Sequence, residues 1–94
     1  MKESELERKV VSHCHQLGLL SYKFTSPSSR GVPDRIVIGR GRVLFLELKR
    51  PGNRPTPLQE REIRRINEHG GRFVSAGWAD SYADCVKLLS EFFT

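Results

Sequence analysis

The chain has 94 residues, a hydrophobic fraction of 37% and a net charge of +5, from 16 basic and 11 acidic side chains. This length allows one domain with a thin core, and no apolar run is long enough to span a bilayer. There is no secretory signal, repeat or low-complexity tail, which predicts an intracellular protein. Cys14 and Cys85 fall on apolar helical faces and are expected to be reduced core residues.

The spacing of apolar residues predicts alternating helices and strands. Apolar side chains recur at helical spacing near both ends of the chain, whereas shorter apolar runs bounded by Gly, Pro and Ser predict strands. Ser4 and Thr56 are candidate N-caps, and Gly39-Arg40-Gly41 is a hairpin signal between two strands. The expected order is helix 4–17, strand 19–25, strand 35–38, strand 43–48, helix 57–69, strand 73–76 and helix 81–93.

This order favours an α/β fold. Apolar side chains on both faces of strand 43–48 predict a central strand that is covered on both sides. Long helical segments between strands favour a mixed central sheet with helices on its faces. We therefore expect a single domain over residues 1–94 with the order α-β-β-β-α-β-α. Trp78, beside Gly77, is expected to be a packing residue.

Charged residues interrupt the apolar pattern at the predicted hairpin. Asp34 opens one strand, and Glu47 and Lys49 lie at the end of the next. Because alternate side chains of a strand share a face, Glu47 and Lys49 should point the same way and Leu48 the opposite way. If the two strands pair, Asp34 returns beside Glu47. Two carboxylates so placed suit Mg²⁺, which binds one or two carboxylates together with waters and substrate phosphate.

Each of these residues also has a purely structural alternative. Asp34 could be a turn or strand-end residue, Glu47 could only pair with Lys49, and Lys49 could be a solvated lysine at a strand end. A carboxylate inside an apolar strand is costly unless it is paired or metal-bound. The grouping of two acids therefore favours metal ligands.

Two further polar candidates lie on predicted helices. Glu7 lies on the inward side of the first helix, but Ser4-x-x-Glu7 also fits a capping box. Glu3 shares that side one turn earlier and is the competing candidate. Gln59 falls on the buried stripe of its helix, and Thr56-x-x-Gln59 is likewise a capping box.

Basic residues are concentrated in the middle of the chain. Residues 30–72 hold 11 of the 16 Lys and Arg side chains. Arginine binds phosphate bidentately, and a basic surface attracts polyanions through counterion release. A solvated charged face is the alternative for those on the helix. We assign DNA contacts to Arg30, Arg50, Arg54, Arg61, Arg64 and Arg65.

Pro-Asp, a hairpin and Glu-x-Lys together form a pattern that resembles the PD-(D/E)XK nuclease superfamily. A wider set of residues resembles the VRR-NUC family of virus-type replication and repair nucleases, over nearly the whole chain. The stretches that carry this resemblance are Gly31-Val32-Pro33-Asp34-Arg35, Glu47-Leu48-Lys49-Arg50-Pro51 and Pro57-Leu58-Gln59.

The resemblance implies a DNA endonuclease that uses Mg²⁺ or Mn²⁺. The metal would be held by Asp34, Glu47 and an acid of the first helix, which Glu7 matches best, with the carbonyl of Leu48 as an extra ligand. Lys49 would stabilise charge on the phosphate, with Gln59 in support. Stand-alone members resemble homodimeric Holliday-junction resolvases, so the implied substrate is branched or four-way-junction DNA and the implied partner is a second copy.

Other interpretations stay open on sequence alone. The protein could be a nickase or nuclease on linear or flap DNA, or a non-catalytic DNA-binding subunit, although a mere binder has no need for clustered acids. For a dimer, the apolar end of the last helix (residues 88–93) and the hairpin at residues 39–41 are the expected interface. The alternative is a monomer in which Phe92 and Phe93 fold onto their own chain.

Overall fold

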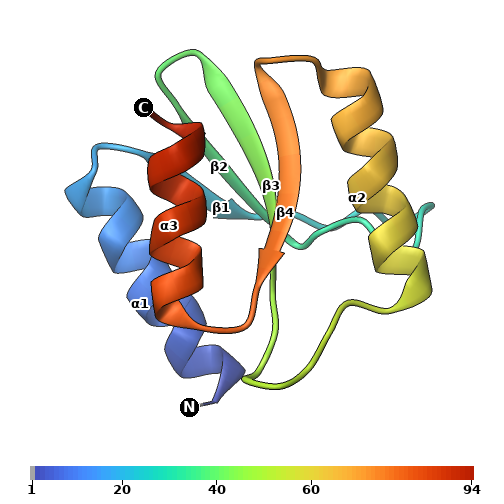
Figure 1. Ribbon diagram of the computed structural model, residues 1–94, viewed down its shortest axis with the longest axis horizontal. Coiled ribbons are helices and arrows are strands. Elements are labelled where there is room, and N and C mark those ends of the chain that lie inside the picture. Colours follow the sequence, from blue (N-terminus) through green and yellow to red (C-terminus); the bar gives the residue numbers. More distant parts are fainter. Residues whose placement is uncertain (1) are drawn as a thin grey trace.

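The computed structural model describes residues 2–94, and its elements follow the predicted order (Figure 1). The prediction of an α/β fold with a mixed sheet is confirmed. The elements are α1 (Glu3–Gln16), β1 (Leu20–Lys23), β2 (Arg35–Gly39), β3 (Arg42–Leu48), α2 (Pro57–Gly70), β4 (Val74–Ala79) and α3 (Tyr82–Phe92).

The strands form one sheet in the order β1-β2-β3-β4. β1 and β2 are antiparallel, as are β2 and β3, whereas β3 and β4 are parallel. Gly39 pairs with Arg42, so the connection between β2 and β3 is the two-residue turn Arg40-Gly41. Both turn residues have positive φ, 51° and 73°. This is the geometry of a tight hairpin whose twist matches that of the strands.

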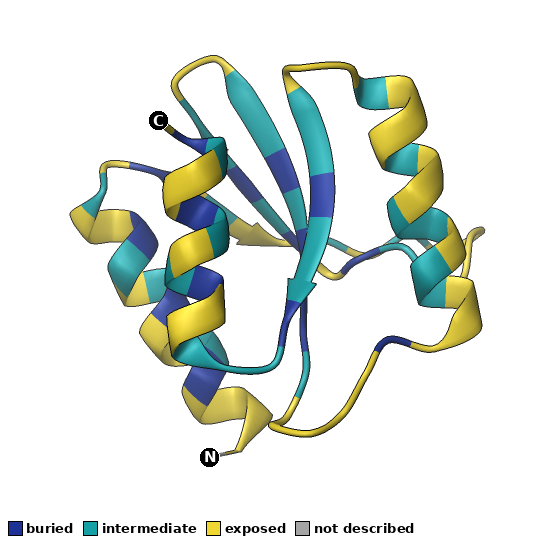
Figure 2. Ribbon diagram, in the orientation of Figure 1, coloured by how far each residue is buried: buried dark blue, intermediate teal, exposed yellow. Residues whose placement is uncertain are grey.

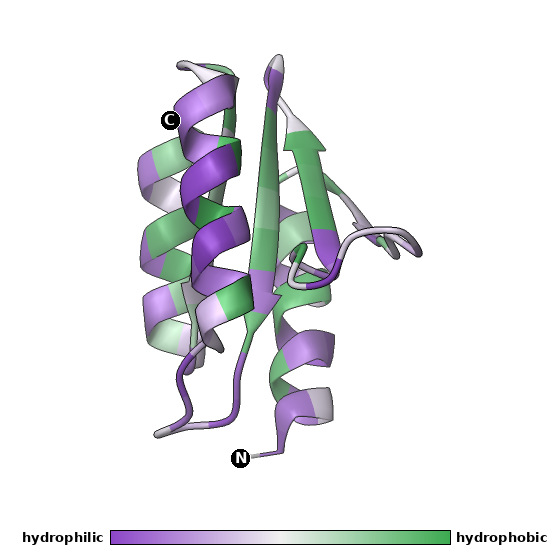
Figure 3. Cartoon of the chain, turned by 90° about the vertical axis from the view of Figure 1, so that its right-hand side faces the viewer, coloured by the Kyte–Doolittle hydropathy of each residue, from purple (hydrophilic) through white to green (hydrophobic). Residues whose placement is uncertain are grey.

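The main core lies on the sheet face that α1 and α3 cover. Alternate residues of β3 point into this core. The strands are hydrophobic over most of their length, whereas the helices also carry hydrophilic residues (Figure 3). α2 contains no buried residue and packs chiefly on β4, so the second face is more thinly covered (Figure 2). The core cluster comprises Leu6, Val10, Cys14, Leu19, Val37, Leu44, Leu46, Leu48, Ala79, Cys85, Leu89 and Phe93.

Of the two N-caps predicted from the sequence, Ser4 is wrong and Thr56 is confirmed. α1 begins at Glu3 with Lys2 as N-cap and without a side-chain cap hydrogen bond, so the prediction of Ser4 as N-cap is wrong. At α2 the predicted capping box is confirmed. The backbone N–H of Gln59 donates to Thr56 Oγ1 at 3.2 Å, and that of Thr56 donates to Gln59 Oε1 at 2.9 Å.

β4 is longer than predicted because Gly77 continues the strand. An added Cβ at Gly77 would lie 2.9 Å from Leu88 Cδ2, so the absence of a side chain lets α3 pack closely on the sheet. The strand therefore runs on through Trp78 to Ala79. Cys14 and Cys85 are buried and free, as predicted. None of the helices found in residues 2–94 is long and apolar enough to cross a membrane.

The end of α3 folds onto its own chain. Phe93 is 2% exposed within the core, and Phe92 packs against it. Arg42 of the hairpin strand donates to the Phe92 carbonyl at 2.8 Å, and Arg40 donates to the carbonyls of Phe93 and Leu17. The apolar helix end and the hairpin are thus occupied within the chain, as in the monomer alternative. These internal contacts leave less of both segments available for the dimer interface that the sequence led us to expect.

Close contact with α2 fixes the loop that leads into β2. Gly31 in this loop has a φ of 85°, and an added Cβ would lie 2.5 Å from the backbone oxygen of Leu58 in the first turn of α2. Glycine is required here twice over, by the left-handed conformation and by the close approach of the two backbones.

We predict that Gly31→Ala destabilises the protein more than Gly41→Ala. Gly41 also has a positive φ, of 73°, but no atom lies within 4 Å of its added Cβ. Gly41→Ala should therefore cost only the left-handed strain of about 1–2 kcal/mol. Gly31→Ala adds a backbone clash and should cost more. Urea denaturation of both variants measures the difference, and equal losses would contradict the close packing of the loop on α2.

Candidate functional site

The hairpin register brings the two predicted acids together. Arg35 of β2 pairs with Leu46 of β3. Because the strands are antiparallel, the residue before Arg35 lies opposite the residue after Leu46, so Asp34 lies across from Glu47. Leu46 and Leu48 point into the main core, and Glu47 therefore points to the opposite face of the sheet. The two carboxyl groups are near enough for the charge of Asp34 to raise the pKa of Glu47.

Glu47 is a buried acid with a strongly shifted pKa. It is 5% exposed, whereas Asp34 beside it is exposed to solvent. Burial is the main cause that raises the pKa of Glu47, from 4.5 to about 7, and the negative charges of Asp34 and Glu3 act in the same direction. The ammonium of Lys49 and a backbone hydrogen bond from Asp34 lower this pKa by less.

Lys49 completes the predicted group. Its Nζ lies 3.8 Å from Glu47 Oε2, and its side chain is 17% exposed. Its backbone N–H donates to the Ala79 carbonyl at 2.9 Å, which holds it to β4 beyond the end of β3. The structure thus brings Asp34, Glu47 and Lys49 together at the end of two strands.

Glu7 is engaged elsewhere. Its Oε1 lies 3.4 Å from Arg35 Nη2 and 3.6 Å from Lys23 Nζ. Arg35 is 5% exposed and also donates to Ser21 Oγ at 2.9 Å. This group lies on the α1 side of the sheet, opposite the face to which Glu47 points. Glu7 therefore balances a buried arginine.

Glu3 is better placed than Glu7 to join the two acids. It lies in the first turn of α1, and the N-terminal end of this helix lies next to the end of β3 (Figure 1). Its charge contributes to the raised pKa of Glu47. Of the two candidates that the sequence left open on the first helix, the geometry favours Glu3.

The remaining candidate residues differ in which of their polar groups are free to bind a ligand. Gln59 uses its side-chain oxygen in the capping box, which leaves its amide NH₂ group for other contacts. The Leu48 side chain is 3% exposed in the core, so only its main-chain carbonyl could serve a metal. All the arginines assigned to DNA are exposed, and Arg65 pairs with Glu62 at 3.1 Å. They are Arg30, Arg50, Arg54, Arg61, Arg64 and Arg65.

The site fits an oxygen-binding cation with few protein ligands. Within residues 2–94 no group of three or more Asp, Glu, His or Cys side chains is arranged to hold a metal ion. Mg²⁺ nevertheless needs only one or two carboxylates when water and substrate phosphate complete its shell. A cation beside Glu47 would favour the ionised form of this buried acid, so the shifted pKa is consistent with such a ligand.

Comparison with known proteins identifies the family. No family model matches the chain. The sequence is 45% identical over 75 residues to "Putative nuclease p44" of Acyrthosiphon pisum secondary endosymbiont phage 1, which covers 79% of this chain and 81% of the phage protein. A solved structure described as "VRR_NUC domain" matches with a TM-score of 0.83 and 26% identity over 96% of each chain. The chain belongs to the VRR-NUC family.

A second solved structure supports the fold of this VRR-NUC domain. It is described as "VRR_NUC domain protein", is 17% identical, and matches with a TM-score of 0.78 over 99% of this chain and 88% of the other. At this identity the likeness concerns the fold alone. The family resemblance expected from the sequence motifs is therefore confirmed.

The shifted pKa of Glu47 predicts how metal-free stability depends on pH. An unfolded glutamic acid titrates near 4.3, whereas folded Glu47 titrates at about 7. Between these values the folded protein keeps a proton that the unfolded chain has released, so stability should fall as pH rises from about 4.3 to 7. In EDTA, the melting temperature of Glu47→Gln should decline less over this range than that of the wild type.

The exposed residue Glu5, on the first turn of the same helix as Glu3, supplies the control. Glu5→Gln should keep the wild-type pH dependence. Identical pH profiles for Glu47→Gln and the wild type would contradict the raised pKa.

Proposed function

We propose that the protein is a Mg²⁺- or Mn²⁺-dependent DNA endonuclease that hydrolyses phosphodiester bonds. The observation that carries this proposal is the buried Glu47 carboxylate, which faces Asp34 and lies 3.8 Å from the Lys49 ammonium. The likeness to the phage protein named as a nuclease supports the same chemistry. A purely DNA-binding role would gain nothing from two acids where phosphate must approach.

The roles follow from the chemistry of each group. Asp34, Glu47 and the Leu48 carbonyl would hold the metal, which when bound would lower the pKa of water and offset phosphate charge. Lys49 places a fixed positive charge where negative charge develops during hydrolysis. The free amide group of Gln59 orients the attacking water or Lys49. The exposed arginines position the DNA backbone.

Removing either acid should abolish cleavage. For Asp34→Ala and Glu47→Ala we expect loss of cleavage with DNA binding kept or improved, because the acids repel phosphate when no metal is present. Lys49→Ala should lose roughly 10²–10³-fold in rate, as for other single electrostatic donors. Single-turnover cleavage with Mg²⁺ or Mn²⁺ measures both effects. Asp84→Ala, an exposed acid of α3, is the control. Cleavage at near wild-type rate in either acid variant would refute the site.

Glu3 would act on the proposed site through its charge near Glu47, as a positioning residue or through a metal-bound water, and Glu7 would have a structural role. Glu3→Gln should weaken Mn²⁺ binding and slow cleavage while leaving stability nearly unchanged. Glu7→Gln should lower the melting temperature, because it leaves buried Arg35 without its counter-charge. Calorimetric Mn²⁺ titration and thermal melting of both variants separate the roles. If Glu7→Gln loses Mn²⁺ binding and Glu3→Gln does not, the assignment is reversed.

Branched DNA is the leading substrate class, on the strength of the family resemblance. Linear and flap DNA are the competing substrates. A matched panel of linear, flap and four-way-junction duplexes of one sequence, cleaved under the same conditions, ranks them directly.

A symmetric junction needs two cuts, and a homodimer supplies them through one self-complementary interface. The open side of the sheet is the best remaining surface for it. Leu20 and Tyr22 of β1 are 53% and 54% exposed, and their register partners Ile38 and Ile36 share their face, away from the main core. α2 packs chiefly on β4, away from β1.

Light scattering tests the dimer. The wild type should be dimeric at micromolar concentration, and Tyr22→Glu should give monomers, because it places a charge in the apolar patch. Phe73→Glu is the matched control, since Phe73 is 57% exposed but lies outside this patch. A monomeric wild type that makes only single nicks in junctions would exclude the dimer while leaving the nuclease proposal intact.

A further inference from the structure

We propose that Trp78 and Arg54 form a stacking site for an unpaired nucleobase next to the scissile phosphate. This inference rests on the proposed endonuclease function and deepens it, because it names the feature of branched DNA that the protein recognises.

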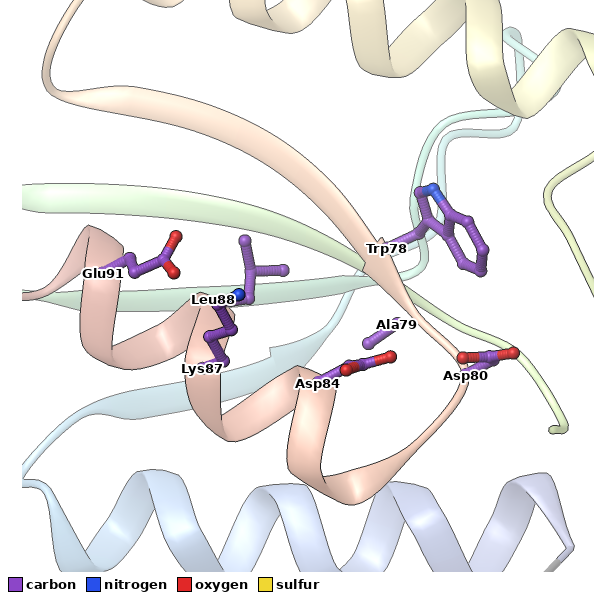
Figure 4. A pocket seen from close by; sticks show the side chains of 7 residues that line it. All are labelled: Trp78, Ala79, Asp80, Asp84, Lys87, Leu88 and Glu91. Atoms are coloured by element: carbon purple, nitrogen blue, oxygen red, sulfur yellow. The ribbon is translucent and has the colours of Figure 1, made fainter.

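The position of Trp78 is the first argument. In the parallel pairing of β3 and β4, Trp78 is the register partner of Glu47. Paired residues of neighbouring strands lie about 4.8 Å apart and share a face. The indole ring therefore projects on the same side of the sheet as the proposed metal ligands. Figure 4 shows it leaving β4 on the side away from α3.

The ring is also available for a ligand. Trp78 is only partly buried, and it belongs neither to the core cluster nor to the side chains packed against that cluster. It takes part in none of the aromatic pairs among the described residues, and none of these residues accepts a hydrogen bond from its indole N–H. Because Trp78 is only partly buried, this N–H is free to bind solvent or a ligand. A packing role, as expected from the sequence, is the alternative that the experiments below separate from a stacking role.

Arg54 supplies the cationic half of the site. Its guanidinium lies 5.9 Å from the centre of the Trp78 ring, within the range of a cation–π contact. It comes from the exposed loop between β3 and α2, which directly follows Lys49. Aromatic rings and arginine planes are the groups on which proteins stack unpaired bases, and the same arginine can contact the adjoining phosphate.

The opposite side of Trp78 is unsuitable for nucleic acid. A groove of about 350 Å³ between the end of β4 and α3 borders Trp78 itself and is also lined by Asp80, Asp84 and Glu91, with Lys87 as its one basic side chain (Figure 4). These acids disfavour phosphate there. The strand is therefore directed over the Arg54 side of the ring, toward the acids of the metal site.

A stacked ligand at this place must be an unpaired base. Bases inside a duplex are stacked on their neighbours, whereas those at a branch point, flap or junction can be splayed out and stacked on aromatic side chains. One such contact contributes roughly 5- to 150-fold in affinity. The site would therefore favour branched or single-stranded DNA over an intact duplex.

Intrinsic fluorescence tests the contact without a mutation, because Trp78 is the one tryptophan of the 94 residues. The wild type is titrated with flap DNA and with a linear duplex of the same sequence, with Ca²⁺ in place of Mg²⁺, while labelled DNA reports binding separately. We expect flap DNA to quench the emission and the duplex to leave it nearly unchanged at equal occupancy. Unchanged emission at saturation with flap DNA would overturn the proposal.

Variants test specificity. Trp78→Leu should lose roughly 5- to 150-fold in affinity for flap DNA and much less for the duplex, whereas Trp78→Phe should keep most of the preference. Phe73→Leu is the matched control, because Phe73 is an exposed aromatic under an arginine, Arg72, at the other end of β4. It should not change the ratio of flap to duplex affinity.

The two proposals fail in different ways. Equal loss on flap and duplex DNA in Trp78→Leu would overturn the stacking site while metal-dependent cleavage persists. If no DNA is cleaved with any metal, the proposed function itself fails, whatever the fluorescence shows.

Discussion

The register between β2 and β3 is the constraint on which the site depends. Side chains alternate along a strand, so a slip of one residue would turn Glu47 into the main core and Leu46 out of it. The two-residue turn at Arg40-Gly41 sets this register, since the positive φ of both residues is what a tight hairpin turn requires. Arg40 and Arg42 reinforce the hairpin by binding carbonyls at the end of α3. The relative position of Asp34 and Glu47 thus depends on a turn at the opposite end of β2 and β3.

The sheet separates two kinds of buried charge. On the α1 side, buried Arg35 meets the Glu7 carboxylate, so the two charges compensate each other. On the other side, Glu47 faces further acids and has a single partner in Lys49, and its pKa rises to about 7. In the first arrangement the loss of either partner would leave an uncompensated charge, although Arg35 Nε is buried without a hydrogen-bond partner. The second is unfavourable for folding alone, which is typical of a functional group.

Much of this could be predicted from local patterns. The element order, the capping box at Thr56 and the hairpin at Arg40-Gly41 depend on residues close in sequence, and all were predicted correctly. Apart from the N-cap of α1, which is Lys2 and not Ser4, the wrong details depend on distant contacts. Gly77 resembles a strand breaker until Leu88 is seen to pack on it, and the apolar end of α3 resembles an interface until Phe93 is seen in the core.

The sequence also could not separate Glu3 from Glu7 as site residues, because both lie on the inward side of α1. Their difference comes from partners on two other elements, Lys23 of β1 and Arg35 of β2, which pair with Glu7. The sequence likewise did not predict that Trp78 lies next to Glu47. This proximity depends on a parallel pairing between strands separated by an entire helix.

The contact between Gly31 and Leu58 has a mechanical consequence. The backbone of the loop that ends at Asp34 rests directly on the first turn of α2, with no side chain between them to absorb movement. A shift of the first turn of α2 would therefore displace the loop as well, and Asp34 lies at the end of this loop. DNA that binds to α2 and shifts it would therefore also change the position of Asp34 relative to Glu47. Binding of DNA to α2 and alignment of Asp34 with Glu47 would then occur together.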